Sequence, residues 1–495
     1  MILQILKIKK KHQIGVFMNL STHLDKNIQS AKDIFPIGKS FDIVTRHLFF
    51  GETRAFWIGI NGFCRNDLLQ LIFSDLQNPL FTKDMKIIDI QKYMNSKIGY
   101  SQAELVNDWD SIVKSVLSGP SALFIDGFSQ AIIIDTRTYP SRSIQEPDSE
   151  KVTRGSKDGF VETLLINTAL MRRRIRNPKL TFKMKSIGSD SKTDVAIGYI
   201  EGKTDQDLLL TLENKLDSLK VTSLTMGTKS LDELLVKKRW CNPLPSFHLT
   251  ERPDVACSYL MEGHMVVVVD TSPSVLILPC TIFEFTQSPE DYYKSPSVGN
   301  YLRMIRFACA IASLLLLPTF LLLGAYFPNL PASWNVLTSK PLAPATLFLY
   351  VLFIEFALDL FKYSSAHASS GFSNSLGIIG GLLISDTAIQ LNWASLEVIF
   401  YGAATMLVTL SLASLEFGEA IRIYRIFLVL CTGFFGLWGY IAGFFLIVIS
   451  IITTPTFANK SYFWPLFPFN WEALKTLLFR YPTAKAQPSK IWKSK

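Results

Sequence analysis

Three charged residues lie on one predicted helix within an otherwise apolar part of the chain. Glu355, Asp359 and Lys362 follow the spacing i, i+4 and i+7, which places all three on one helix face. A charge at the centre of a bilayer costs about 2.5 to 3.5 kcal/mol, so such residues normally face a protein interior or a water-filled path. The spacing predicts an ion path or a subunit contact, or else an amphipathic helix at the membrane surface with its acids among the headgroups.

A third acid follows a glycine-containing apolar stretch. Asp386 comes directly after Gly380-Gly381-Leu382-Leu383-Ile384-Ser385. An acid at the mouth of a pore attracts cations, which makes Asp386 a second candidate for an ion path. The alternative is a loop position after a short span.

Arginines cluster at one place in the polar N-terminal part. The cluster consists of Arg172, Arg173, Arg174 and Arg176. Grouped guanidinium groups bind phosphates of lipids or nucleic acids, whereas a solvated helix face that meets nearby acids is the simpler interpretation. No aromatic residues alternate with the arginines, so we expect no nucleic acid. The cluster remains our candidate for a subunit or partner contact.

The motifs of common enzymes are missing from the sequence. No Walker loop, no GxGxxG after a predicted strand and no GxSxG are present. The six histidines and six cysteines have no spacing typical of metal ligands. We therefore expect no enzymatic activity, cofactor or metal, and reduced thiols in a cytosol-facing head.

Long apolar segments indicate the element that must position these charges. Segments at 307–327, 341–361, 376–391, 396–415 and 426–454 approach the roughly 20 residues needed to span a bilayer. Basic residues flank the group on both sides, which favours both ends inside. An even number of crossings then requires that one segment does not span, and 341–361 and 376–391 are the candidates. Arg422 and Arg425 fall on the outer side, against this rule.

The polar part ahead of these segments alternates between helical and strand patterns. We expect helices at 20–36 and 102–117 and strand pairs with an Asp-Gly turn. The stretches 123–136 and 259–271 resemble each other, which indicates either two related subdomains or two unrelated hairpins. The predicted fold is a polytopic α-helical membrane domain preceded by a cytoplasmic α/β head of two subdomains. We expect an N-terminal segment and helix at 1–35, followed by two α/β subdomains at 36–137 and 138–302. The membrane domain follows at 303–456, and a basic cytoplasmic tail at 457–495.

Many spaced residues resemble one known family, the A subunits of bacterial spore germinant receptors, or GerA family. The similarity extends from about residue 30 to residue 470. The matching residues include Pro140-Ser141-Arg142, Gly159-Phe160-Val161-Glu162, Asn167, Glu251-Arg252-Pro253-Asp254, Gln287-Ser288, Glu355, Asp359, Gly380-Gly381, Gly436 and Pro465-Leu466.

The resemblance implies a role in spore germination. It implies a protein of the spore inner membrane, with its head on the core side, that assembles as a ring of like subunits and conducts or releases monovalent cations. A receptor-type A subunit would act with B and C partners that sense a nutrient. The chain looks more like the stage V sporulation branch of the family, which would pair with a small membrane protein. A nutrient-sensing A subunit and a non-conducting membrane scaffold are the alternatives.

Overall fold

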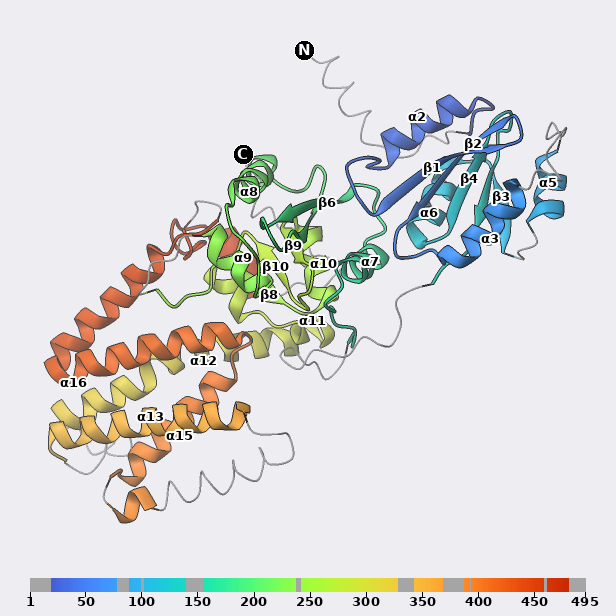
Figure 1. Ribbon diagram of the computed structural model, residues 1–495. Coiled ribbons are helices and arrows are strands. Elements are labelled where there is room, and N and C mark those ends of the chain that lie inside the picture. The colour runs from blue at the N-terminus through green and yellow to red at the C-terminus, as the bar shows by residue number, and fades with distance from the viewer. Residues whose placement is uncertain are drawn as a thin grey trace.

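The first α/β unit is a five-stranded antiparallel sheet between two layers of helices. The computed structural model describes residues 19–77, 89–98, 102–138, 155–236, 242–327, 342–367, 387–391, 393–457 and 461–479. The strands run in the order β1-β2-β4-β5-β3, and Figure 1 shows them in blue and teal. They are β1 (Ile43–Phe50), β2 (Thr53–Ile60), β3 (Ala103–Val106), β4 (Ser121–Ile125) and β5 (Ala131–Ile134).

Alternating side chains of these strands form two cores, one on each face of the sheet. Successive residues of a strand point to opposite faces, so Phe124 packs in one core and Leu123 in the other. Helices α2 (Leu24–Ile34) and α6 (Trp109–Ser118) cover the first face. Helices α3 (Asn66–Gln77) and α5 (Ile90–Lys97) cover the second face.

The second α/β unit repeats this arrangement. Its strand order, β6-β7-β9-β10-β8, is the order of the first sheet with every strand number raised by five. Helices α7 (Leu164–Arg174) and α10 (Pro253–Glu262) cover one face, and α8 (Gln206–Ser218) and α9 (Thr228–Leu235) cover the other. The strands are β6 (Leu180–Ile187), β7 (Thr193–Ile200), β8 (His248–Thr250), β9 (Met265–Val269) and β10 (Val275–Leu278).

Corresponding hydrogen bonds hold the first helix of each unit to its sheet. The carboxylate of Asp126, after β4, accepts the backbone N–H of Leu24 at 3.0 Å. The carboxylate of Asp270, after β9, accepts the N–H of Leu164 at 3.0 Å. Each aspartate therefore satisfies one of the free N–H groups at a helix start, at the same place in both units.

A buried asparagine is repeated as well. Asn27, in α2, bonds both backbone groups of Ser21, at 3.0 and 2.6 Å. Asn167, in α7, bonds both backbone groups of Val161, at 2.8 and 2.5 Å. The two units are thus related in detail, which favours the first of the two interpretations of the repeated stretches.

The correspondence between the units differs from the one expected from the sequence. Residues 123–136 do form the pair β4–β5 with a turn at Gly127. Residues 259–271, however, comprise the end of α10 and the single strand β9, so this stretch is not a hairpin. The true counterpart of β4–β5 is β9–β10, because Asp270 rather than Glu262 occupies the position of Asp126.

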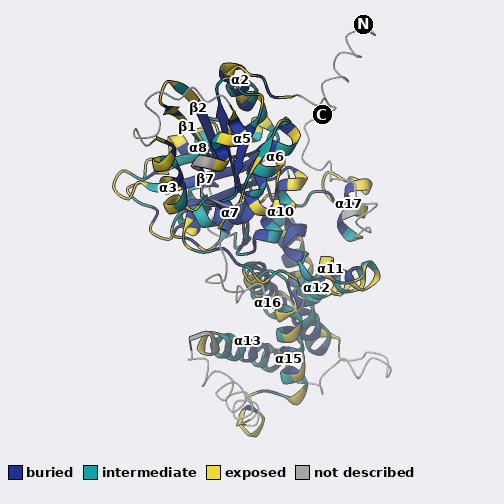
Figure 2. Ribbon diagram, turned by 90° about the vertical axis from the view of Figure 1, so that its right-hand side faces the viewer, coloured by how far each residue is buried: buried dark blue, intermediate teal, exposed yellow. Residues whose placement is uncertain are grey.

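The C-terminal part is a bundle of apolar helices. Helices α12 (Pro296–Tyr326), α13 (Pro344–His367) and α16 (Leu415–Ile452) are each long and apolar enough to cross a membrane. The shorter α15 (Leu396–Leu410) packs against α12 and α13. Figure 2 shows the strands of the head as buried, while much of the bundle surface is half-buried or exposed. An α/β head followed by several membrane helices confirms the predicted fold class.

Helix α16 is a hairpin of two antiparallel arms rather than one straight rod. Gly436 has φ +59° and ψ −137°, a backbone conformation that glycine adopts without steric cost. The hydroxyls of Tyr424 and Ser450 lie 2.9 Å apart, whereas 26 residues of straight helix would separate them by about 39 Å. Gly439 allows the close approach, since a Cβ there would collide with the carbonyl oxygen of Cys431.

This hairpin corrects the count of membrane crossings. The run 426–454 belongs to two passes, so an even total does not require that one apolar segment fails to span. The candidate 341–361 forms most of α13, which is long and apolar enough to cross. The other candidate, 376–391, lies almost entirely outside the described residues.

The second α/β unit packs on one end of the bundle, here called the head end. Lys229 of α9 pairs with Glu416 at the start of α16 at 3.2 Å. Asn242 bonds Thr454 at 2.8 Å, just past the second arm. The opposite, far end is where the hydroxyl of Tyr326 reaches the backbone of Gly433 beside the hairpin turn. The first arm of the hairpin therefore starts at the head end, and the second arm returns to it.

Candidate functional site

The charged face of α13 lies against a second charged face on the first arm of α16. Glu355 pairs with Arg425 at 2.5 Å, Asp359 with Arg422 at 3.0 Å, and Lys362 with Glu419 at 3.2 Å. We call these six residues the charge seam. It contains three acids and three bases, so its formal charge is zero.

Helix geometry explains why the residues meet in this order. The α13 residues are spaced i, i+4 and i+7, and the α16 residues are spaced i, i+3 and i+6, so each set occupies one helix face. Phe348 of α13 lies beside Gly433 at the far end, and Lys362 reaches the head end. The two helices therefore run in opposite directions, which pairs the first charge of one with the last of the other.

The deepest pair is fully enclosed by the four helices. The side chains of Arg425 and Glu355 are only 5% and 4% exposed. Arg425 also donates to the carbonyl oxygen of Ser313 in α12 at 3.0 Å and to the hydroxyl of Thr409 in α15 at 3.3 Å. A buried guanidinium requires this many partners to offset its loss of water. Arg425 thus joins α12, α13, α15 and α16 at one point.

Exposure increases along the seam toward the head end. The side chains of Arg422 and Asp359 are 25% and 31% exposed, and those of Lys362 and Glu419 are 34% and 55% exposed. A pocket of about 40 Å³ lies beside the seam, with Thr405 among its lining residues. This volume accommodates a few water molecules. The seam therefore grades from an enclosed pair to charges that reach the surface of the chain.

The structure places only some of the predicted site residues in this seam. Glu355, Asp359 and Lys362 lie together as their spacing predicts, but each has a partner of opposite charge on α16. Asp386 lies outside the described residues. The sequence reasoning missed Glu419 and treated Arg422 and Arg425 only as exceptions to the orientation rule. These three residues share one helix face, and their charges are opposite in sign to those on the face of α13. This pattern in the sequence would have identified them.

The arginine cluster does not act as one surface. Arg172 is buried and its guanidinium binds Asp42 of the first unit at 2.7 Å and the carbonyl oxygen of Leu180 at 2.9 Å. It joins the two α/β units within the chain, so the predicted partner contact is wrong for Arg172. Arg174 pairs with Asp158 at 2.5 Å. Arg173, Arg174 and Arg176 are exposed and stay candidates.

The junction between head and bundle contains a buried carboxyl group. Glu284 belongs to the short helix η1 (Ile282–Thr286), which leads toward α11 (Glu290–Tyr293) and α12. Burial raises the pKa of Glu284 to about 8, and one of its carboxyl oxygens has no hydrogen-bond partner. The group is therefore most stable in its protonated form.

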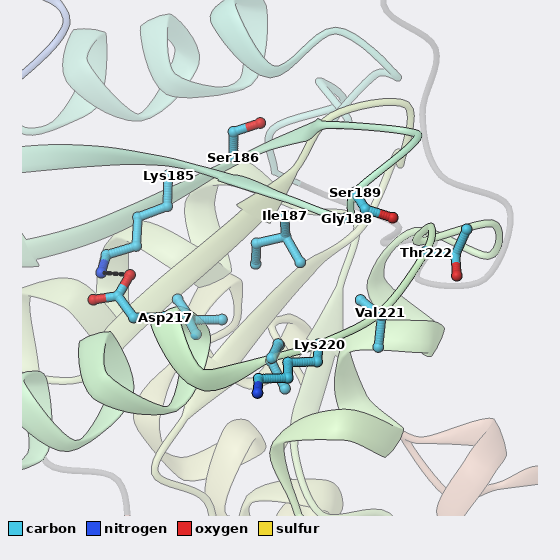
Figure 3. A pocket seen from close by; sticks show the side chains of 11 residues that line it. Lys185, Ser186, Ile187, Gly188, Ser189, Asp217, Lys220, Val221 and Thr222 are labelled. Carbon is cyan, nitrogen blue, oxygen red and sulfur yellow. Dashed lines mark hydrogen bonds and ion pairs between the residues drawn. The ribbon is translucent and has the colours of Figure 1, made fainter.

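An open groove of about 540 Å³ lies in the head beside the β6–β7 turn. Figure 3 shows Lys185 against Asp217 on one side of it, with Ser189 and Thr222 on the other. The Lys185 to Asp217 distance is 2.5 Å, so this lysine is already paired. Among the described residues no group of three or more histidine, cysteine, aspartate and glutamate side chains could hold a metal ion.

Comparisons with known proteins find relatives that match most of the chain. The family model described as Bacillus/Clostridium GerA spore germination protein matches residues 32–490. The chain is 34% identical to the stage V sporulation protein AF of Bacillus subtilis (strain 168) over 97% of this chain and 96% of that protein. It is 27% identical to the spore germination protein KA of the same organism over 94% of this chain and 85% of that protein.

One solved structure is also similar. It is the N-terminal domain of the A subunit of the Bacillus megaterium spore germinant receptor GerK3, at 25% identity and a TM-score of 0.40, covering 53% of this chain and 97% of that one. The family match spans most of the chain, and the apolar helices make this a membrane protein. The chain therefore belongs to the GerA family of spore germination proteins.

Proposed function

We propose that the chain is a subunit of an oligomeric channel in the inner membrane of the spore, with its head on the cytoplasmic core side. The channel conducts or releases monovalent cations from the spore core during germination. Membership of the GerA family supports the role in germination, and the relatives are themselves named as sporulation and germination proteins.

The observation that carries the proposal is the exposed half of the charge seam. Asp359, Lys362 and their partners keep between a quarter and about half of each side chain exposed, although α13 is apolar enough to span the membrane. Lys362 and Glu419 lie toward the head end, but Asp359 and Arg422 lie about one helical turn further in, where charges become costly against lipid. A like subunit or a hydrated space must therefore cover them in the assembled protein, and a path between subunits supplies both.

The enclosed pair has a different role in this proposal. Glu355 is neutralised by Arg425, so it offers no free carboxylate to a passing cation in this state. The pair instead holds the four helices of one subunit together behind the exposed part of the seam. Asp386 remains the candidate acid for the pore mouth, and Arg173, Arg174 and Arg176 remain candidates for contacts with other germination proteins.

Cation flux through the purified full-length chain in vesicles tests the proposal. Wild type should admit rubidium, whereas Asp359→Asn and Lys362→Gln should change the rate because they alter the charges that line the exposed seam. Asp207→Asn is the matched control, since this exposed acid lies on α8 in the head. The mass of the assembly, measured in detergent, should be the same for all four proteins.

Two outcomes would favour the alternatives. Loss of assembly in the seam variants with no flux in wild type would favour a non-conducting scaffold. Flux that requires added B-type and C-type subunits and a nutrient would favour the A subunit of a germinant receptor. Rubidium uptake by wild type that the seam substitutions leave unchanged would reject the seam as the path.

A further inference from the structure

An exposed aromatic turn follows the last pass of the bundle. The turn comprises residues 466–471, and the side chains of Phe467, Phe469 and Trp471 are each more than half exposed. The rings of Phe469 and Trp471 stack at 6.4 Å. Nothing in the described part of the chain covers this surface, which would be unfavourable in water because large apolar side chains are grouped on it.

The residues around the turn fix it at the head end of the bundle. Phe463 stacks on Phe283 at 5.9 Å, and Phe283 lies 6.3 Å from Phe307, where the uncharged run of α12 begins. On the other side, Arg303 of α12 donates to the carbonyl oxygen of Leu477 at 2.9 Å. The turn and the helix α17 (Trp471–Leu478) are therefore level with the first turns of the membrane part of α12.

Helix α17 presents apolar residues to the protein and polar residues outward. Ala473, Leu474 and Leu477 are buried against the rest of the chain, while Glu472 and Lys475 are exposed. Figure 2 shows α17 beside α11 and α12, next to the boundary between head and bundle. The aromatic turn, including Trp471 at the start of α17, is therefore exposed, while the apolar side of α17 packs on the protein.

We propose that the aromatic turn inserts into the headgroup layer of the bilayer that the helices cross, on the head side, and so fixes the depth of α12. Tryptophan favours this layer, and the phenylalanine side chains of segments that lie on a membrane bury at the boundary between headgroups and acyl chains. Continuity with the membrane part of α12 selects lipid as the occupant, because Arg303 holds α17 at the level where that part begins. Residues 466–471 are thus a membrane-surface element instead of part of a soluble tail.

Site-specific photocrosslinking tests the insertion. A benzophenone amino acid replaces Phe469 in the full-length chain, which is reconstituted in vesicles of phosphatidylethanolamine and phosphatidylglycerol and irradiated. The same replacement at Phe434, exposed near the hairpin turn, is the positive control. The replacement at Phe49, which is also more than half exposed on β1 of the head, is the negative control. We expect an adduct of one phospholipid mass at positions 469 and 434 and none at 49.

The outcomes separate lipid from protein occupants. A chain-to-chain adduct at 469 with no lipid adduct, or no adduct at 469 while 434 is labelled, would overturn the proposal. If the labelled variants fail to fold, Trp471→Phe provides a second measurement. A nitroxide near the lipid headgroup should quench part of the tryptophan emission of the wild type, and this quenched part should be smaller in the variant. An unchanged quenched fraction would also overturn the proposal. Neither readout depends on whether the chain conducts ions.

Discussion

Replacing Glu355 with leucine should destabilise the membrane bundle strongly, because it leaves a buried guanidinium without its counter-ion. The Glu355 and Arg425 side chains are almost completely enclosed and share two hydrogen bonds, at 2.5 and 3.0 Å. Removing one partner of a buried ion pair costs about 3 to 5 kcal/mol. Arg425 keeps its bonds to Ser313 and Thr409, so we expect a loss near the lower limit.

The double variant separates the missing charge from the missing volume. Glu355→Leu with Arg425→Met replaces both ions by apolar side chains of similar size, which is often close to neutral. We expect the double variant to lose no more than about 1 kcal/mol, since packing changes of this kind usually cost less than about 1.5 kcal/mol. The second substitution should thus recover most of the stability that the first removes.

The thermal midpoint of the full-length chain in detergent measures these losses of stability. It is obtained from the fraction of protein that stays monodisperse at each temperature. For a unit of this size about 2 to 4 °C correspond to 1 kcal/mol, so Glu355→Leu should lower the midpoint by about 6 to 12 °C. Asp359→Asn is the control from the exposed part of the seam, where a pair contributes about 1 kcal/mol or less. Equal midpoints for the single and the double variant would refute the reasoning.

Three further substitutions test other buried features by the same midpoint. Asp42→Ala should cost about 3 to 5 kcal/mol, because it leaves the enclosed Arg172 unpaired between the two α/β units. Glu284→Gln should abolish a pH dependence of the midpoint. Burial raises the pKa of Glu284 from 4.5 to about 8, so the folded chain binds this proton more tightly than the unfolded chain does. The wild type should therefore lose stability as the pH rises from 4.5 to 8, and the variant should not. Gly439→Ala should open the hairpin, since the added methyl group collides with the carbonyl of Cys431; an unchanged midpoint would contradict the tight turn.

The sequence predicted the faces of helices better than the partners of those faces. Glu355, Asp359 and Lys362 lie together because helical spacing is a local property that one segment determines by itself. Their pairing with α16 depends on which helices pack together and in which direction. Arg172 shows the same limit, since its partner Asp42 is 130 residues away and nothing in the local arginine run distinguishes a buried side chain from an exposed one.

The hairpin and the shortest strands were not evident from composition. The run 426–454 is uncharged throughout, and a single glycine with positive φ reverses it without any change in hydropathy. Residues 102–117, expected to be one helix, comprise β3 followed by α6, because pairing of Ala103–Val106 with β5 outweighs a four-residue helical pattern. Tertiary contacts determined both outcomes.

The hairpin at Gly436 also bears on how the chain is made. The first arm starts at the head end and the second arm returns to it, so the two arms can enter the bilayer together, as a pair of helices, during synthesis. With the head on the cytoplasmic side, as proposed above, residues 461–479 stay on the side of synthesis, together with Glu472 and Lys475 among them. In that orientation the last two passes form without export of these charges.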